Sequence, residues 1–220
     1  MIMQIADVLP PGRVAEFMER LGGAAAGFHP GAMTAGWHAR GVKNNEQASG
    51  EAAREVAGAV EQALLAHPVF KAAARPKRLV GLLVSRYGAG MEYGRHVDDA
   101  LMQGVRTDLS FTVFLNGPEA YEGGELLIEG HDGETAITLS AGSAVVYPTS
   151  SLHRVAQVIR GERLVVVGWV RSLIRRADQR ELLFDLDTAV AQLRQSGADR
   201  ASLDPVLKVR ANLLRMWAED

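Results

Sequence analysis

The chain changes its hydrophobic period twice along its length. In the first third, apolar residues recur at helical spacing between Pro10-Pro11-Gly12 and a stop at Gly22-Gly23. A second, Ala-rich stretch from about Ala48 to His67 has the same character. These patterns predict that residues 1–77 form a mostly helical region that packs on a core built by the rest of the chain.

The middle of the chain has a different pattern. Short runs of branched and aromatic residues alternate there with turn formers such as Asn116-Gly117-Pro118 and Gly123-Gly124. The expected strands are residues 79–87, 109–115, 125–129, 136–139, 144–147, 155–159 and 164–170. Strands of this length and spacing are typical of a sandwich or barrel. We therefore expect a β-barrel over residues 78–172.

From Leu173 onward the helical period returns, with a break at Ser196-Gly197 and a last helix that ends near Trp217. We expect a helical extension over residues 173–220, so the fold class is α+β with a mainly β core. Three arginines at the start of this region are interpreted as a solvated helix face: Arg175, Arg176 and Arg180. The apolar stripe of the helices packs either on the core or against another subunit, which makes a homo-oligomer a hypothesis.

The composition excludes several classes of protein. A chain of 220 residues, 47% of them hydrophobic, can bury one substantial core. Its formal net charge of −2 provides no basic field for binding nucleic acid. It has no cysteine, so any metal must be held by nitrogen and oxygen ligands. No apolar run approaches the roughly 20 residues of a membrane span, and no basic residue precedes the first apolar stretch, which predicts a cytoplasmic protein without a membrane partner.

Two histidines and one aspartate in the β region form a candidate metal site. His96 and Asp98 are two residues apart, so in an extended segment their side chains point to the same face. A His-x-Asp pair on its own is common and decides little. A third ligand must come from a distant strand, and His153 lies between two runs of strand character. Two imidazoles and one carboxylate that leave coordination positions open are the ligand set of non-haem Fe(II) oxygenases.

Arg163 lies ten residues after His153 and begins an expected strand in which apolar residues share its face. An Arg that points into an apolar barrel needs an anionic partner, and Arg can hold a carboxylate bidentately. If residues 154–160 and 163–170 formed a tight hairpin, Arg163 would lie about 20 Å from His153, at roughly 3.3 Å per residue. The two side chains reach one cavity only if their strands lie in opposing sheets.

The glycine-rich segment 86–95 places Tyr87 and Tyr93 close to the candidate metal ligands in the sequence. It lacks the Gly-Lys-Ser/Thr ending of a phosphate-binding loop. A buried Tyr hydroxyl needs a partner, and a bound carboxylate would serve. Two half-buried strand tyrosines explain the same pattern equally well.

A polar segment near the N-terminus also has two interpretations. Lys43, Asn44 and Asn45, together with Trp37, could line the mouth of a substrate site, because polar loops beside a rigid barrel often do. An ordinary helix start with capping asparagines explains the segment equally well. The sequence leaves the roles of Trp37, Asn44 and Asn45 open.

An ordered set of motifs covers nearly the whole chain. The first is R-Y-x-x-G-x-x-Y-x-x-H-V-D over residues 86–98. It is followed by T-D-L-S leading into F-L-N, then by Y-E-G-G-E-L, then by P-x-x-x-x-H and Arg163. V-K-N-N near the start and L-F-D-L-D near the end extend the set. In this order the motifs resemble those of the prolyl-4-hydroxylase-like 2-oxoglutarate oxygenases and, more narrowly, the bacterial PKHD-type hydroxylases.

The resemblance implies a double-stranded β-helix core, a jelly-roll barrel, with Fe(II) on His96, Asp98 and His153. It also implies that Arg163 holds the distal carboxylate of the co-substrate 2-oxoglutarate and that Tyr87 is a second contact to it. The expected reaction hydroxylates a primary substrate and converts 2-oxoglutarate and O2 to succinate and CO2. L-ascorbate is the accessory reductant that the family suggests.

Two further features bear on the expected reaction. In related halogenases a chloride ion takes the coordination position that the resemblance gives to Asp98. The presence of the carboxylate here therefore favours hydroxylation over halogenation. Phe114 stands where some relatives carry Tyr, so one possible hydrogen bond to the co-substrate is absent. The primary substrate is either a small molecule or a protein side chain, and a link to bacterial iron uptake is implied by the resemblance alone.

Two other functions remain open on the same barrel. One is a zinc or manganese enzyme that uses the same three ligands for hydrolysis or isomerisation. It has no use for an inward Arg163. The other is a non-catalytic module that binds a small anion, and it would bind 2-oxoglutarate without producing succinate.

Overall fold

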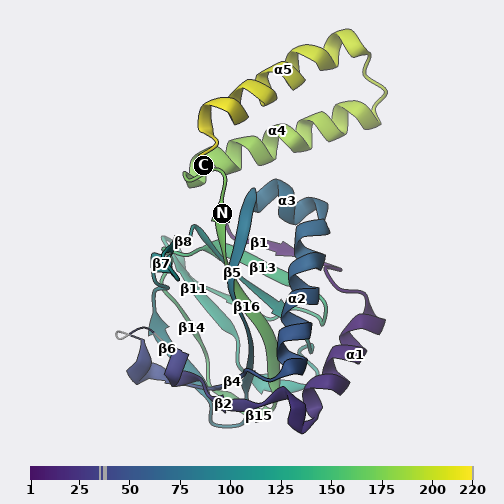
Figure 1. Ribbon diagram of the computed structural model, residues 1–220. Coiled ribbons are helices and arrows are strands. Elements are labelled where there is room, and N and C mark those ends of the chain that lie inside the picture. The colour runs from purple at the N-terminus through teal and green to yellow at the C-terminus, as the bar shows by residue number, and fades with distance from the viewer. Residues whose placement is uncertain (35, 37–38, 220) are drawn as a thin grey trace.

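A computed structural model describes residues 1–34, 36 and 39–219, in which two antiparallel β-sheets face each other (Figure 1). Within these residues the larger sheet has seven strands, in the spatial order β1 (Met3–Ile5), β13 (Ala144–Pro148), β9 (Leu109–Phe114), β16 (Arg163–Ser172), β5 (Pro76–Tyr87), β4 (Glu46–Ala48) and β2 (Phe28–Pro30). The smaller sheet has five described strands, β12 (Gly133–Ile137), β11 (Leu126–Gly130), β14 (His153–Val155), β6 (Glu92–His96) and β3 (Lys43–Asn44). The mainly β core that the sequence predicts is confirmed.

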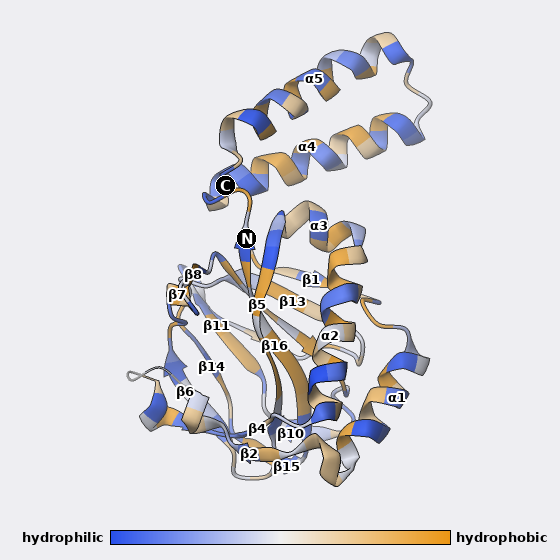
Figure 2. Cartoon of the chain, viewed as in Figure 1, coloured by the Kyte–Doolittle hydropathy of each residue, from blue (hydrophilic) through white to orange (hydrophobic). Residues whose placement is uncertain are grey.

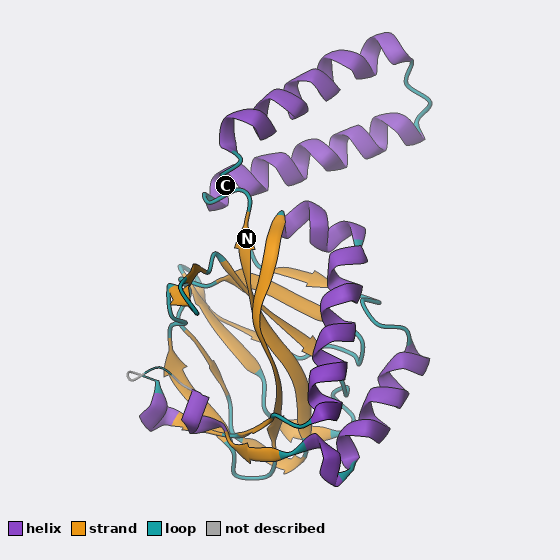
Figure 3. Ribbon diagram, viewed as in Figure 1, coloured by secondary structure: helices purple, strands orange, loops and turns teal. Residues whose placement is uncertain are grey.

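Two short ribbons and several helices complete the described fold, as Figure 3 shows. The ribbons are β10 (Tyr121–Gly123) with β15 (Val158–Gly161), and β7 (Leu101–Met102) with β8 (Val105–Arg106). The helices before the barrel are α1 (Pro11–Gly22), α2 (Glu51–Ala66) and α3 (Pro68–Ala74), with the 3-10 turns η1 (Ala24–Ala26), η2 (Gly31–Thr34) and η3 (Arg40–Val42). Two helices follow the barrel, α4 (Ala177–Gln195) and α5 (Arg200–Trp217).

The larger sheet is covered on both faces. On its outer face, Val56, Val60 and Leu64 of α2 are fully buried in one cluster with Val84 and Val166 of the sheet. All six residues of β9 are buried, as expected for a strand with a helix layer on one side and a second sheet on the other. Figure 2 shows hydrophobic residues along β13 and β16 of this sheet. Burying each of these aliphatic side chains contributes about 1.5–3 kcal/mol, so this layer holds the barrel in shape.

The N-terminal third contains strands as well as the expected helices. β1, β2 and β4 extend the larger sheet, and β3 extends the smaller one. The interpretation of the asparagines as a capped helix start is wrong, because Asn44 lies in β3 and α2 begins only at Glu51, after Gly50. Glu46–Ala48 pairs with β5 instead, and that pairing holds Ala48 in a strand rather than in the helix.

The strand expected over residues 155–159 is two strands. β14 pairs with β6 and β11 in the smaller sheet, whereas β15 pairs with β10. At the break Gln157 packs closely on Gly123, which has a positive φ of 74° and at which a Cβ would overlap the carbonyl oxygen of Gln157. The chain therefore changes partners between Val155 and Val158.

The two C-terminal helices form a hairpin that projects from the barrel (Figure 1). Arg75, just after α3, contacts α4 twice. It donates to the carbonyl oxygen of Leu183 at 3.2 Å and pairs with Asp187 at 2.5 Å. None of the described residues of α5 is buried. The chain after α5 is held at the junction with the barrel, because Arg106 pairs with Glu219 at 2.6 Å and the Glu219 amide donates to the carbonyl oxygen of Leu173 at 2.8 Å.

The interpretation of the basic cluster as a solvated face agrees with the exposure of Arg175 and Arg176 but is wrong for Arg180. Its side chain is buried and donates to the carbonyl oxygens of Ile174 at 2.8 Å and Arg175 at 2.7 Å. It therefore closes the turn that leads from the barrel into α4. Among the helices of the described chain, none combines the length and hydrophobicity that a bilayer span requires.

The packing of α3 on the larger sheet gives a test of the core. Phe70 is fully buried and meets Phe111 edge to face at 6.2 Å between ring centroids. We expect Phe70→Ala to lower the free energy of unfolding by about 3–5 kcal/mol, measured by urea denaturation, because it leaves a cavity in this layer. The neighbouring Val69→Ala is the control, since Val69 is 38% exposed and should cost less than about 1 kcal/mol. Equal losses for the two variants would contradict this account of the core.

Candidate active site

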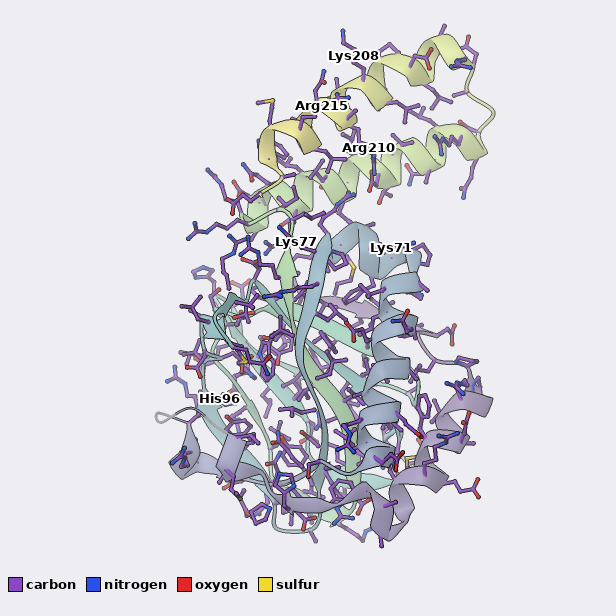
Figure 4. All side chains as sticks on the ribbon, viewed as in Figure 1. Lys71, Lys77, His96, Lys208, Arg210 and Arg215 are labelled. Atoms are coloured by element: carbon purple, nitrogen blue, oxygen red, sulfur yellow. The ribbon has the colours of Figure 1, made fainter. Side chains whose placement is uncertain are left out.

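A cavity of about 440 Å³ lies between the two sheets and is lined by residues of both. The larger sheet contributes Tyr87, Ser110 and Arg163, and the smaller one contributes His96 and His153. His96, labelled in Figure 4, is the last residue of β6. The cavity brings together the residues that the sequence analysis singled out for metal and co-substrate binding.

The three candidate metal ligands converge because two adjacent strands place them together. β14 pairs with β6 so that His153 lies directly opposite His96, and their ring centroids are 4.3 Å apart. Asp98 follows two residues after the end of β6, with its carboxylate oxygens 3.9 Å from His96 Nε2 and 3.7 Å from His153 Nε2. One ligand atom from each of the three residues lies within 4.8 Å of the others. Such a set of two imidazoles and one carboxylate fits a divalent iron.

Hydrogen bonds orient all three side chains. The Nδ1 atoms of His96 and His153 lie 2.8 Å and 3.0 Å from the carbonyl oxygens of Gly94 and Ser151, so each Nδ1–H donates and each Nε2 stays free for a metal. The Ser110 hydroxyl donates to Asp98 at 2.6 Å. Partners of this kind fix the tautomer and direction of metal ligands.

The protonation state of His96 also suits metal binding. Burial and the neighbouring His153 lower the pKa of His96 from 6.5 to about 4. Tyr93 stacks on the His96 ring at 3.7 Å between centroids and adds to its burial. Since a metal binds the neutral imidazole, no proton has to leave this side chain near neutral pH.

Arg163 lies across the cavity, in the opposite sheet. It is the first residue of β16, directly opposite Tyr87 in β5, whereas His153 belongs to β14 of the smaller sheet. The requirement that the two strands lie in opposing sheets is confirmed. The Arg163 side chain is 1% exposed, and no carboxylate of the described residues pairs with it. Its guanidinium carbon lies 5.2 Å from the ring centroids of both Tyr87 and Phe114.

Sequence reasoning missed several polar residues of the cavity. Tyr147 meets His153 edge to face at 5.1 Å, and burial raises the pKa of its phenol well above the ordinary value. Its backbone pairs with that of Ser110, the residue that holds Asp98. Ser110 belongs to the T-D-L-S motif of the family resemblance, which was the available signal for it, whereas Tyr147 precedes the P-x-x-x-x-H motif and lies outside it.

The polar N-terminal segment reaches the cavity as well. Lys43 and Asn45 line it, together with Gln47, which agrees with the interpretation of this segment as part of a substrate mouth. Asn44 points elsewhere and donates to the carbonyl oxygen of Gly90 at 3.3 Å. Trp37, proposed for the same mouth, lies outside the described residues.

Two sequence profiles match parts of the chain, and relatives of high identity match its whole length. The profile of the 2OG-Fe(II) oxygenase superfamily matches residues 82–171, and that of the PKHD-type hydroxylase C-terminal domain matches residues 178–219. A PKHD-type hydroxylase from Maricaulis maris is 54% identical over 221 residues, and one from Acaryochloris marina is 52% identical over 221 residues, with each alignment covering 100% of both chains. The match is therefore continuous from the barrel into the hairpin.

Solved structures agree on the fold. A prolyl-4-hydroxylase from Pseudomonas putida superposes with a TM-score of 0.58 at 24% identity, covering 78% of this chain and 92% of the other. The epimerase SnoN from nogalamycin biosynthesis gives a TM-score of 0.56 at 17% identity, covering 79% of this chain and 78% of the other. These likenesses bear out the double-stranded β-helix core that the resemblance implied.

Lys43 provides a test of how closed this cavity is. Its ammonium lies 5.2 Å from the Tyr93 ring centroid and 3.1 Å from the Thr34 hydroxyl, and burial lowers its pKa from 10.5 to about 8. The charged form is therefore disfavoured on folding, at a cost fully present below pH 8 and lost as the pH rises towards 10.5. In the metal-free protein we expect Lys43→Met to raise the free energy of unfolding by about 1–2 kcal/mol at pH 7, with the gain shrinking above pH 8.

The control for this prediction is Lys77→Met, because Lys77 is exposed at the start of β5 (Figure 4). Its effect on the free energy of unfolding should change little over the same pH range. Denaturation curves at several pH values measure both variants. A difference between wild type and Lys43→Met that stays constant from pH 7 to about 10 would contradict the burial of Lys43.

Proposed function

Because the chain belongs to the PKHD-type hydroxylases of the 2OG-Fe(II) oxygenase superfamily, we propose that His96, Asp98 and His153 are the residues that hold its iron. The protein is a 2-oxoglutarate-dependent dioxygenase. The observation that carries the assignment of ligands is the convergence of two imidazole nitrogens and a carboxylate in the lining of the cavity. Family membership favours this function over a zinc or manganese enzyme and over a non-catalytic anion-binding module.

Arg163 and Tyr87 are proposed to hold the distal carboxylate of 2-oxoglutarate. Arg163 is a buried cation without a carboxylate partner in the described chain, and its Nε has no hydrogen-bond partner there. Tyr87 lies directly opposite it and lines the same cavity. A bound carboxylate would neutralise the guanidinium and accept hydrogen bonds from it. Phe114, on the other side of Arg163, offers only its ring face.

Each proposed side chain has a defined task. His96 and His153 bind as neutral imidazoles held by backbone carbonyls, and Asp98 supplies a negative charge that Ser110 orients. Arg163 orients the co-substrate from the opposite sheet. When bound, iron and 2-oxoglutarate supply the oxidation, in which one oxygen atom of O2 enters succinate and the other enters the hydroxylated product.

The substrate class, the reductant, the location and the assembly of the protein are proposed as well. The primary substrate is a small molecule or a protein side chain, and a cavity of about 440 Å³ suits either. L-ascorbate as reductant rests on the family resemblance, and a cytoplasmic location rests on the sequence. Exposed Leu182, Val209 and Met216 on the C-terminal hairpin support a homo-oligomer. The division into an N-terminal region, a barrel and an extension at residues 77 and 172 is also kept as a proposal.

The proposed function predicts a binding signal that precedes turnover. We expect wild-type protein loaded with Fe(II) without oxygen to develop a visible charge-transfer band on titration with 2-oxoglutarate. His153→Ala should abolish the band, because it removes a ligand. Arg163→Ala should raise the dissociation constant of 2-oxoglutarate about 100-fold, because it removes the partner of the distal carboxylate.

An exposed histidine and an exposed arginine provide the controls. His131→Ala and Arg160→Ala, the latter at a residue whose side chain is 83% exposed, should leave the band and the dissociation constant unchanged. Admitting oxygen should then release succinate slowly even without a primary substrate. The absence of both band and succinate from folded, iron-loaded wild type would overturn the proposed function.

The orientation of Asp98 gives a second test. Ser110→Ala removes the hydroxyl that donates to Asp98 at 2.6 Å, and we expect the Fe(II) dissociation constant to rise about tenfold. Competition with a chelating dye under anaerobic conditions measures it. Ser140→Ala, at an exposed position in the loop before β13, is the matched control. Unchanged iron affinity in Ser110→Ala would remove Ser110 from the account of the site.

A further inference from the structure

The segment from Lys43 to Ala48 crosses from one sheet to the other. Lys43–Asn44 pairs with β6 in the smaller sheet, and Glu46–Ala48 pairs with β5 in the larger one. Asn45 is the residue between these two strands. Because the segment is extended, alternate side chains point to opposite sides, and Lys43, Asn45 and Gln47 face the cavity.

Two of these three inward residues have partners in the protein. Lys43 donates to the Thr34 hydroxyl at 3.1 Å, and Gln47 donates through Nε2 to the Ser85 hydroxyl at 3.4 Å. The Asn45 side chain differs, because its residue is only 4% exposed and neither Nδ2 nor Oδ1 has a hydrogen-bond partner. Buried amides almost always find a partner, so an unpartnered one that lines a cavity points to a ligand.

The position of Asn45 is fixed by its surroundings rather than by the side-chain amide. Its carbonyl oxygen accepts a hydrogen bond from the Gly31 amide at 2.7 Å, and a Cβ on Gly31 would overlap Asn45 Oδ1. The side chain therefore packs against a residue that has no side chain of its own. Truncating the side chain leaves the backbone hydrogen bond to Gly31 in place, so the fold should persist.

The neighbours of the amide indicate which ligand it meets. Glu46 lies opposite Arg86 and Gln47 lies opposite Ser85, so the same antiparallel register continued by one residue places Asn45 opposite Tyr87. Asn45 thus lies beside Tyr87, which in turn lies directly opposite Arg163. An amide offers a donor and an acceptor at once, so Nδ2–H can donate to a carboxylate while Oδ1 accepts from a phenol.

We infer that Asn45 is a third contact for the distal carboxylate of 2-oxoglutarate, beside Arg163 and Tyr87. The inference rests on the proposed function, since it places a further residue in the same co-substrate site. It gives the V-K-N-N motif a role in co-substrate selection: Asn45 distinguishes dicarboxylic 2-oxo acids from monocarboxylic ones. Water or the primary substrate are the competing partners for this amide.

The experiment is a charge-transfer titration of anaerobic, Fe(II)-loaded protein with two 2-oxo acids. One is 2-oxoglutarate, and the other is 2-oxobutyrate, which keeps the metal-chelating end but lacks the distal carboxylate. We expect Asn45→Ala to raise the dissociation constant of 2-oxoglutarate about tenfold and Asn45→Asp to raise it further, since a second carboxylate repels the first. Neither variant should change the dissociation constant of 2-oxobutyrate more than about twofold.

Asn44→Ala is the matched control, because Asn44 is the preceding residue and points out of the cavity towards Gly90. It should leave both dissociation constants unchanged. Thermal unfolding without ligand checks that each variant is folded, and Asn45→Asp keeps nearly the native shape should Asn45→Ala prove unstable. Calorimetry with the same ligands measures affinity without relying on the band.

The outcomes distinguish a failure of the role of Asn45 from a failure of the proposed function. A wild-type band with equal 2-oxoglutarate affinity in all variants overturns the role of Asn45 and assigns the amide to water or primary substrate. Equal weakening of both 2-oxo acids also overturns it, because the effect would not depend on the distal carboxylate. No band in folded, iron-loaded wild type overturns the proposed function and this inference together.

Discussion

The cavity is organised around a buried positive charge that the described protein does not neutralise. Arg163 is 1% exposed, and the groups that flank it include the ring faces of Tyr87 and Phe114, while no carboxylate of the described residues pairs with it. Aromatic faces stabilise a cation only in part, and a buried unpaired charge costs several kcal/mol. The free protein therefore carries a cost that an anionic ligand would remove. Since a ligand that binds only the folded state stabilises it, co-substrate binding and stability should be linked through this one side chain.

The rest of the site follows from two cross-strand pairs, one in each sheet. In the smaller sheet β14 places His153 opposite His96, and in the larger sheet β16 places Arg163 opposite Tyr87. Residues directly opposite on adjacent strands lie about 5 Å apart, so each pair is set by the backbone register and not by flexible loops. A one-residue slip in either sheet would turn its pair out of the cavity. The helix layer on the larger sheet thus supports the chemistry by holding that register.

The sequence predicted the parts of this arrangement that depend on local pattern. Strand periodicity located most of the barrel, and the His-x-Asp spacing with a distant His and Arg pointed to the residues that the cavity brings together. The N-terminal strands were not foreseen, because elements of two or three residues carry no readable period and are held by pairing with distant strands. The buried Arg180 was misread for a related reason, since only the three-dimensional turn after β16 provides its carbonyl acceptors.

The lining of the cavity explains why the co-substrate can be read from the sequence and the primary substrate cannot. Tyr87 and Arg163 lie on paired strands, whose backbone leaves few arrangements for the side chains. Leu101 and Gln103 line the cavity as well, and Leu101 is 65% exposed on the short ribbon of β7 and β8, while Gln103 has a positive φ of 52°. Residues on loops beside a rigid scaffold vary with the substrate more than with the fold. The strand-borne part of the cavity is therefore compatible with primary substrates of different kinds.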